Sequence, residues 1–490
     1  MSGLGPRRPW RPRASPPPPL PPLLAPLLAL VVVAATRCPS ASALKACDVV
    51  VVVLSQTDSH HIDLAQQLKA DIHKQALAVS QDVPVVHLAH EEFSHPGTWT
   101  VVPILPKLRA LHGDNSSWIF FCEEHTKINL PYVLRILEKH DPNELMWVGH
   151  AIYDREATII HHFAFFENPQ HFKYPSFASG FAMTSTLLRR LSAQVLEYGA
   201  STDFSIDPAH ELALFIWNNG KGPRITHVPH LCLQNNEDCA SYPMPFTPCS
   251  DPVSKKSIYF AVKTCGKFHH DRIPVIKKTW AKYVLNIGFY SEVTDNSIPT
   301  IDLGVPNTER GHCGKTFAIL KHVASHVKKH PEIKWIVVVD DDTILSVTRL
   351  QQLLSCYDPK IMTAIGERYG YNVQHSDQGY NYITGGGGMV FSTNLIQAIV
   401  KSEQCQCPSN STPDDMFLGI CLSSLNVPIT HSPLFHQARP SDYAPEYLTT
   451  QVPVSFHKHW MIDPLKVYKK WFADADKQFE EVIQNKHVEL

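Results

Sequence analysis

Three consecutive carboxylates, Asp340, Asp341 and Asp342, follow a run of apolar residues and are the side chains best placed for chemistry. Residues 336–339 have the composition of a strand buried on both faces, as in a parallel α/β sheet. Ligands of such sheets bind beyond the carboxyl ends of the strands. Adjacent carboxylates repel each other unless a positive charge is close, and a hard divalent cation supplies it. The pattern predicts a metal site, with a solvated acidic turn as the alternative.

A second pair of carboxylates, Asp414 and Asp415, stands behind Thr412 and Pro413. These residues are typical of a helix start, with Thr412 as the N-cap, Pro413 in the first turn and an acid three residues after the cap. A capping role accounts for one carboxylate of the pair and leaves the other without a structural explanation. Because a helix N-terminus lowers the pKa of a nearby carboxylate, we expect an ionised side chain that is able to act as a general base.

Four glycines, residues 385–388, form a third unusual segment. Glycine loses more conformational entropy than other residues and packs no side chain, which is tolerable where the backbone must approach a ligand closely. A flexible linker is the alternative, but the apolar residues 389–391 resume a strand immediately. The segment is therefore expected to line a ligand site.

The elements around these motifs are typical of a nucleotide-binding α/β unit. Residues 258–263 predict its first strand. Arg272 follows, where its guanidinium would meet a diphosphate or base, or else form a surface ion pair. Residues 289–292 end the next strand and offer Glu292 to a nucleoside pocket. Lys315 is placed to offset phosphate charge.

The sequence repeats weakly on either side of residues 233–256, whose Pro, Ser, Asn and Asp content indicates a linker. Residues 118–126 match residues 335–343, and shorter matches follow in the same order. These are Ser185-Thr186 with Ser392-Thr393, Pro208-Ala209-His210 with Pro413-Asp414-Asp415, and residues 225–229 with 429–433. Ordered matches predict two copies of one α/β fold, over residues 44–232 and 257–486.

The two copies differ where chemistry is expected. The Asp triplet is replaced in the first copy by Glu123, Glu124 and His125. These residue types can still ligate a metal, but the first copy has no counterpart of Asp415. A degenerate binding or structural domain is the expectation for this half.

Length, composition and the N-terminus set the class of protein. A chain of 490 residues exceeds one ordinary domain. With 44 basic and 46 acidic side chains its net charge is −2, which gives no sign of a nucleic-acid partner. Residues 1–43 combine a basic start, a short apolar run and a small-residue cleavage site, as in a secretory signal peptide. An uncleaved anchor, with association to the membrane of the endoplasmic reticulum, is the alternative.

Further features agree with the secretory lumen. Asn115 and Asn410 begin glycosylation sequons, the second followed by Pro413. Of 12 cysteines, Cys38 is expected to leave with the signal, and the odd remainder suits disulfides plus an unpaired thiol. Residues 487–490 resemble the retrieval tetrapeptide of the endoplasmic reticulum, with a valine where an acid is usual. The lumen of the endoplasmic reticulum is the expected location.

The second copy resembles the Fringe-like β-1,3-glycosyltransferases, which have the GT-A fold. The resemblance covers about residues 257–470. Its motifs are Arg272 with Thr279-Trp280, Lys334-Trp335 before the Asp triplet, Thr384 before the glycines, Pro413-Asp414-Asp415-Met416 with Leu418-Gly419, and Phe456-His457. The expected fold is α/β, with two tandem GT-A-like domains, the first degenerate and the second catalytic.

The resemblance implies a metal-dependent inverting glycosyltransferase. Asp342 would bind Mn²⁺ or another divalent cation directly. His457, after the strand-like residues 452–456, would be the second ligand. Asp415 would be the catalytic base. The donor would be bound by Arg272, Glu292, Lys315, Gly386, Gly387 and, at the ribose or around the metal, Asp340 and Asp341.

Within this family, the doubled architecture, signal peptide and Glu-Leu ending are similar to those of enzymes that transfer glucose from UDP-glucose to O-linked fucose on thrombospondin type 1 repeats. The residues alone do not separate glucose from galactose or N-acetylglucosamine, because one added group is worth only about 1–3 kcal/mol in an apolar pocket. A luminal glycan-binding chaperone is the remaining alternative, which the first copy by itself would fit.

Overall fold

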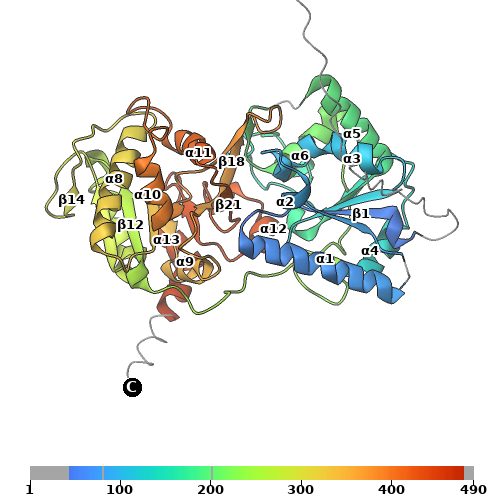
Figure 1. Ribbon diagram of the computed structural model, residues 1–490, viewed down its shortest axis with the longest axis horizontal. Helices are drawn as coiled ribbons and strands as arrows, with labels where there is room; N and C mark the ends of the chain where they lie inside the picture. Colours follow the sequence, from blue (N-terminus) through green and yellow to red (C-terminus); the bar gives the residue numbers. More distant parts are fainter. Residues whose placement is uncertain (1–43, 80–81, 200–201, 479–490) are drawn as a thin grey trace, which may run out of the picture. The chain divides into compact units, whose positions relative to one another are not determined.

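A mixed sheet of seven strands organises the second half of the chain (Figure 1). In spatial order its strands are β14 (Thr300–Ile301), β13 (Asn286–Tyr290), β12 (Ile258–Lys263), β15 (Trp335–Asp340), β20 (Met389–Ser392), β17 (Ala364–Gly366) and β21 (Ile429–His431). All neighbours are parallel except β20, which is antiparallel to both β15 and β17. The strands predicted from residues 258–263 and 336–339 are confirmed, in a sheet that is mostly rather than wholly parallel.

The first half carries a sheet with the same strand order. Its strands are β2 (Val85–Leu88), β1 (Val49–Val53), β3 (Trp118–Cys122), β8 (Phe181–Thr184), β5 (Trp147–Gly149) and β10 (Thr226–His227). Here β8 is the antiparallel strand, as β20 is in the other sheet. Trp118 pairs with Thr184 and Trp335 with Ser392, so the predicted match of Ser185 with Ser392 is wrong by one residue. Both paired residues cap the helix that follows.

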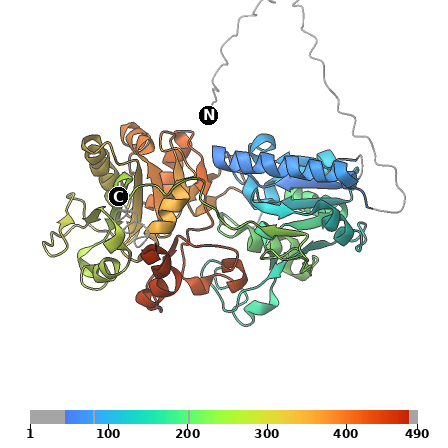
Figure 2. The same cartoon turned by 90° about the horizontal axis from the view of Figure 1, so that it is seen from below.

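Helices cover both faces of each sheet (Figures 1 and 2). They are α1 (Ser59–Val79), α2 (Ala89–Glu92), α3 (Leu105–His112), α4 (Leu130–Leu137), α5 (Ser185–Tyr198), α6 (Pro208–Trp217), α7 (Ile273–Lys278), α8 (Cys313–Lys329), α9 (Val347–Leu354), α10 (Thr393–Lys401), α11 (Asp414–Ser424), α12 (Pro445–Leu448) and α13 (Pro464–Trp471). The long helix α1, blue in Figure 2, runs along the first sheet. The α/β fold class is confirmed.

Alternation along β15 divides the core around the second sheet. Successive side chains of a strand point to opposite faces. Ile336 and Val338 belong to the core that includes α8 and α10, whereas Val337 and Val339 belong to the core that includes α7 and α9. Burial on both faces explains why residues 336–339 are an unbroken apolar run.

Contacts within the described residues join the two halves. Strand β9 (Phe204–Ser205) pairs with β18 (Arg368–Tyr371), which pairs in turn with β19 (Tyr380–Ile383). The indole nitrogen of Trp99 donates to Asn381 Oδ1 at 2.9 Å. Shorter pairs are β4 (Thr126–Ile128) with β11 (Ser241–Pro243), β16 (Thr343–Leu345) with β22 (Ser455–His457), and β6 (Ala151–Ile152) with β7 (Tyr174–Pro175). The described residues lie in one compact unit, and the predicted domain bounds stay a prediction.

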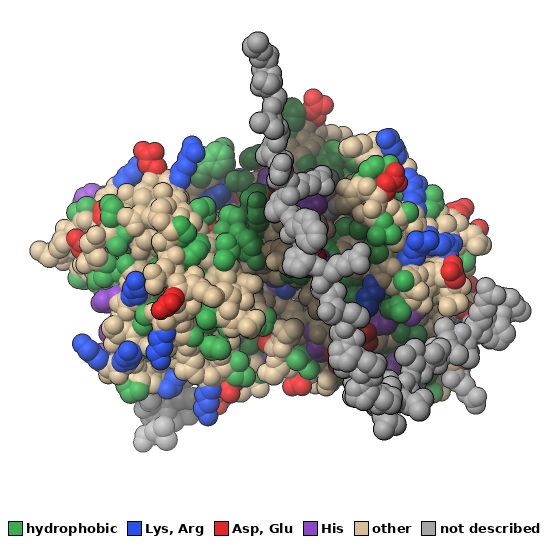
Figure 3. All heavy atoms as spheres, turned by 45° about the horizontal axis from the view of Figure 1, so that its top comes forward, with side chains coloured by type: hydrophobic (Ala, Val, Ile, Leu, Met, Phe, Trp, Pro, Cys, Tyr) green, Lys and Arg blue, Asp and Glu red, His purple; other side chains and the backbone are tan. Residues whose placement is uncertain are grey.

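The computed structural model describes residues 44–79, 82–199 and 202–478. The predicted signal segment, 1–43, and the predicted retrieval tetrapeptide, 487–490, lie outside these residues. Within the described ranges, no helix combines the length and the apolar character that a membrane crossing needs. Basic and acidic side chains are interspersed over the face that Figure 3 shows, in keeping with a net charge near zero.

Disulfides tie several of the loops. Four bonds lie between described residues: Cys232 to Cys239, Cys249 to Cys356, Cys313 to Cys407, and Cys405 to Cys421. Cys47 is disulfide-bonded as well. Among the described residues, Cys122 and Cys265 are free and buried, which agrees with the expectation of disulfides and an unpaired thiol. The connectivity follows from tertiary packing and was not readable from spacing.

Candidate active site

The Asp triplet lies at the carboxyl end of β15, as predicted, and one of its members meets a histidine. Asp342 Oδ1 lies 3.0 Å from His457 Nε2, and Asp340 Oδ2 lies 3.8 Å from the same nitrogen. Strand β22 brings this histidine in, because Thr343 pairs with His457 across β16 and β22. The strand expected over residues 452–456 is shifted: β22 begins at Ser455 and includes the histidine. Ligand atoms of the three side chains lie within 4.8 Å of one another.

The electrostatics of this group suit a cation. Burial opposes ionisation of Asp342, but the hydrogen bond and charge of His457, together with Arg272, lower its pKa to about 2. Burial likewise opposes protonation of His457, yet Asp342 raises its pKa. Two carboxylates and an imidazole are ligands that fit a divalent cation such as Mn²⁺. Asp340, Asp342 and His457 could therefore hold one.

Asp341 points to a different set of partners. It accepts hydrogen bonds from Thr264 Oγ1 at 2.7 Å and from Arg272 Nη1 at 2.6 Å. Burial raises the pKa of Asp341 to about 6 in spite of the guanidinium. Arg272 also lies 3.0 Å from Asp342 Oδ2 and stacks 3.7 Å over the Phe268 ring. The ion pairs of Arg272 are therefore partly buried and are made with the Asp triplet; its contact with a diphosphate or base stays a prediction.

Lys263 is a site residue that the sequence reasoning missed. Its ammonium lies 3.0 Å from Asp340 Oδ1 and 2.7 Å from Asp414 Oδ2. The side chain is buried at the end of β12, in register with Asp340, and the two carboxylates raise its pKa against the effect of burial. The sequence feature that could have indicated its role is a lysine at the end of an apolar, buried strand. This single cation joins the Asp triplet to the Asp414–Asp415 pair.

The two carboxylates at the start of α11 have different surroundings. Asp414 accepts from Lys263 Nζ and from Thr316 Oγ1, the latter at 2.6 Å, and despite burial its pKa is lowered to about 2. The side chain of Asp415 accepts from its neighbouring amide, Met416 N, at 2.8 Å. Burial and the charge of Asp414 raise the pKa of Asp415 to about 6. The expectation that the helix end lowers this pKa is wrong, because desolvation is the larger effect.

The predicted cap of α11 is also wrong. The helix begins at Asp414, Pro413 occupies the N-cap position, and no side chain caps the helix. Thr412 precedes the N-cap position by one residue, and its hydroxyl forms a 2.9 Å hydrogen bond with Ser409 Oγ. The helix start still places both carboxylates in the first turn, which is the feature that the chemistry needs.

Comparison with known proteins identifies the family of the chain. Residues 253–478 match the family model described as Fringe-like. A mouse β-1,3-glucosyltransferase is 49% identical over 447 residues, covering 90% of each chain. A human β-1,3-glucosyltransferase is 51% identical and covers 90% of this chain and 89% of its own. The chain belongs to the Fringe-like glycosyltransferase family.

More distant members of the family match only part of this glycosyltransferase. A chicken protein named β-1,3-N-acetylglucosaminyltransferase lunatic fringe is 27% identical over 209 residues, covering 38% of this chain and 57% of its own. A solved glycosyltransferase involved in glycosylation of the PBCV-1 major capsid covers 44% of this chain at a TM-score of 0.27, too low to indicate a shared fold. The predicted family resemblance is confirmed, and the protein is an enzyme.

The predicted donor residues Glu292 and Lys315 of this glycosyltransferase contact each other. Lys315 Nζ lies 3.1 Å from Glu292 Oε2 and donates to Thr264 O at 2.9 Å and Asn307 Oδ1 at 2.8 Å. Glu292 Oε1 accepts from Gly266 N at 3.0 Å. The pair therefore braces the loop after β12. A direct contact of either side chain with the donor remains a prediction.

The glycine run of the enzyme packs against the predicted metal ligand. A Cβ on Gly386 would lie 2.2 Å from His457 Nδ1 and 2.3 Å from His457 Cε1. Gly387 N donates to Gln437 Oε1 at 3.0 Å, and Gln437 O accepts from His457 Nδ1 at 2.9 Å. The run thus fixes the ring of the histidine. Contact of Gly386 and Gly387 with donor or acceptor stays a prediction.

Gly386→Ala should impair this glycosyltransferase more than Gly385→Ala. The added methyl at Gly386 displaces the His457 ring, and overpacking of this kind costs about 1–3 kcal/mol of stability. A Cβ on Gly385 meets only Lys263 Nζ, at 3.8 Å, an ordinary contact. Melting temperature and Mn²⁺ affinity of the two variants provide the measurement. Equal values for both would contradict the packing role.

The two predicted sequons of the enzyme lie at exposed positions. Asn115 follows the end of α3, and Asn410 lies in the loop before α11; both side chains are exposed. The second loop is held by the Cys405–Cys421 and Cys313–Cys407 bonds. Exposure is compatible with glycosylation, which stays a prediction at both sites.

Proposed function

We propose that the protein transfers glucose from UDP-glucose, in β-1,3 linkage, to O-linked fucose on thrombospondin type 1 repeats. The observation that carries the reaction class is the connected site in which Lys263 links the Asp340–Asp342–His457 group to Asp414–Asp415. The names of the mouse and human relatives support glucose as the donor sugar. The acceptor follows from the resemblance of the doubled chain to enzymes that extend O-linked fucose.

The donor diphosphate would lie at the edge of β15. When bound there, a divalent cation such as Mn²⁺ offsets the charge of the phosphates. Asp342 and His457 would hold it, with Asp340 close enough to share the task. Arg272 adds a positive charge beside this group, and Asp341 orients the guanidinium through its 2.6 Å hydrogen bond.

The acceptor hydroxyl would be deprotonated by Asp415. Asp414 is already bonded to a cation and a hydroxyl, whereas Asp415 accepts from a single backbone amide among the described residues. A carboxylate with free acceptor capacity and a raised pKa is suited to take up a proton. The hydroxyl oxygen attacks the anomeric carbon as its bond to the diphosphate breaks, and one displacement inverts an α-linked donor to a β linkage.

A donor panel tests the proposal. Purified protein with Mn²⁺ would be incubated with UDP-glucose, UDP-galactose or UDP-N-acetylglucosamine, with and without an O-fucosylated thrombospondin repeat. We expect a β-1,3-linked hexose on fucose with UDP-glucose and a much lower rate with the other donors. Preference for another donor would change the donor sugar in the proposal and leave the proposed mechanism unaltered. Absence of transfer from every donor would instead favour a glycan-binding chaperone.

The proposed location is the lumen of the endoplasmic reticulum. Deleting residues 487–490 should therefore cause secretion of an active enzyme, because the retrieval signal is lost. The deletion lies outside the described residues and beyond α13, so we expect the melting temperature to be unchanged. The measurement is the enzyme in medium and in cell fractions, with the N-terminus of the secreted protein sequenced. Retention of the truncated enzyme, with an intact N-terminus, would favour a signal anchor.

A further inference from the structure

A cavity of about 300 Å³ lies at the carboxyl edge of the first sheet, between the first half and the second. Glu123 and His125, which replace two members of the Asp triplet, line it together with His60 and His61 of α1. The opposite wall comes from the second half and includes Glu367. The volume is at the lower end of the range for small-molecule sites. The lining residues are separate from the active site around Asp342 and Asp415.

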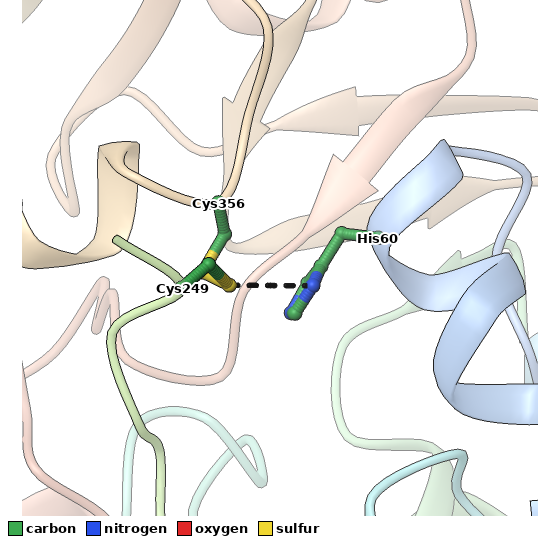
Figure 4. Close-up of side chains that lie close together, drawn as sticks. All are labelled: His60, Cys249 and Cys356. Atoms are coloured by element: carbon green, nitrogen blue, oxygen red, sulfur yellow. Dashed lines mark hydrogen bonds between the residues drawn. A yellow bond between two sulfur atoms is a disulfide. The ribbon is translucent and has the colours of Figure 1, made fainter. Parts of the chain in front are cut away.

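The walls of the cavity are held in place by covalent and polar contacts. The Cys249–Cys356 disulfide ties the segment that contributes Phe246 and Thr247 to the end of α9. Figure 4 shows His60 reaching this disulfide, with His60 Nδ1 3.5 Å from Cys249 Sγ. Because the two cysteines are bonded to each other, they offer no thiolate to a metal. The arrangement is a preformed wall rather than a metal centre.

The charge of the lining does not favour a phosphate-bearing ligand. Neither lysine nor arginine is among the residues that line the cavity in the described part of the chain. At the position that Lys263 occupies in the second sheet, directly after the last shared strand residue, the first sheet has Leu54. A diphosphate needs cations or amide nests. The cavity therefore does not suit a second nucleotide-sugar donor.

Two of the three carboxyl groups that line the cavity have a raised pKa, and the third is paired with a histidine. Burial raises the pKa of Glu123 to about 8, helped by Glu124, and burial raises the pKa of Glu367 to about 8. Asp207, the third lining carboxylate, stays ionised: burial opposes this, but His161 lowers its pKa, and Asp207 accepts from His161 Nε2 at 3.0 Å in an ion pair. Protonated carboxyls, imidazoles and tyrosine hydroxyls both donate and accept hydrogen bonds without net charge. Such a lining favours an uncharged polyhydroxyl ligand.

Aromatic and apolar surfaces complete the lining. The rings of Tyr443 and Tyr447 stack at 6.1 Å, and Phe177, Phe246 and Tyr357 also line the cavity. Aromatic rings offer flat apolar area at a low cost in conformational entropy. The C–H face of a sugar ring packs on such surfaces, while its hydroxyls reach the polar groups. We propose that this cavity is a binding site for a neutral saccharide, distinct from the site of transfer.

Hydrogen bonds connect the proposed site to the active site. The backbone N–H of Gln437 donates to Glu367 in the cavity wall, and its side-chain oxygen accepts from Gly387 N at 3.0 Å. The carbonyl oxygen of Gln437 also accepts from His457 Nδ1. A saccharide in the cavity would thus lie next to Gln437, which contacts both the glycine run and His457. A neutral saccharide at this position could be part of the glycan of a substrate or product that is bound next to the active site.

Filling the cavity tests the proposal. Ala178→Trp and Thr247→Trp each place an indole at a position that lines the cavity. Thr247 is exposed, so its replacement is not expected to impair folding. Ala70→Trp, on the exposed side of α1, is the matched control. Binding of a panel of methyl hexosides, methyl fucoside and glucose-containing disaccharides would be measured by saturation-transfer NMR, with UDP and Mn²⁺ saturating the active site.

We expect at least one probe of the panel to bind the wild-type protein and the Ala70→Trp control. Affinity should fall more than about tenfold, or 1.4 kcal/mol, in both cavity variants. Transfer to a small fucoside should continue in these variants, which separates this inference from the proposed function. Unchanged binding in either folded cavity variant would overturn the proposal, as would failure of every probe to bind the wild-type protein at millimolar concentration.

Discussion

Asp415→Asn is expected to lower turnover by about 10²–10⁴-fold, the usual contribution of a general base. Asparagine keeps the shape of the side chain and cannot take up the proton of the acceptor hydroxyl. Binding of the UDP-sugar should be nearly unchanged, because Asp414 and Lys263 continue to hold the helix start. The measurement is kcat with a fucoside acceptor, beside donor affinity by calorimetry. A purely structural role would instead lower the melting temperature with turnover retained.

The pH profile gives an independent test of the same residue. The pKa of Asp415 is raised to about 6, first by burial and then by Asp414. A base acts in its ionised form, so the wild-type rate should fall as pH drops through about 6. The residual rate of Asp415→Asn should lack this inflection. An unchanged inflection in the variant would assign the titration to another group.

Asp342→Asn is expected to remove most metal-dependent turnover while the protein stays folded. The amide keeps the shape and loses the charge that a hard cation requires. Mn²⁺ affinity, measured by electron paramagnetic resonance of the free ion, should fall in parallel with activity. Asp377→Asn, at an exposed position away from the Asp triplet, is the matched control. Near-normal turnover of a folded, Mn²⁺-saturated variant would remove Asp342 from the metal site.

Much of the site could be predicted where local pattern and chemistry coincide. The apolar run before Asp340 defined β15 and its buried character, since a strand covered on both faces has no polar positions. The meeting of Asp342 with His457 required the family resemblance, because 115 residues separate them and the pairing of β16 with β22 is a tertiary fact. The periodicity of apolar residues does not indicate that His457 is the partner of Asp342.

The parts that could not be predicted depend on burial and register. Lys263 was readable as a strand end, but its ion pairs with Asp340 and Asp414 depend on the alignment of β12 with β15 and on the approach of α11. The pKa of Asp415 was predicted with the wrong sign, because the sequence indicates the helix end and not the desolvation around it. Thr412 was assigned the cap that Pro413 occupies.

The pairing of β9 with β18 predicts that the second half does not behave as a separable module. Residues 204–205 form one edge of a three-stranded sheet whose other strands carry residues 368–371 and 380–383. Expressing only the family-matched segment, 253–478, would leave β18 as an open strand edge, a template for aggregation. Gln374 would also lose its 2.9 Å bond to Ser205. Although the two sheets share one strand order, this pairing predicts that each half depends on the other to cover its exposed strand edge.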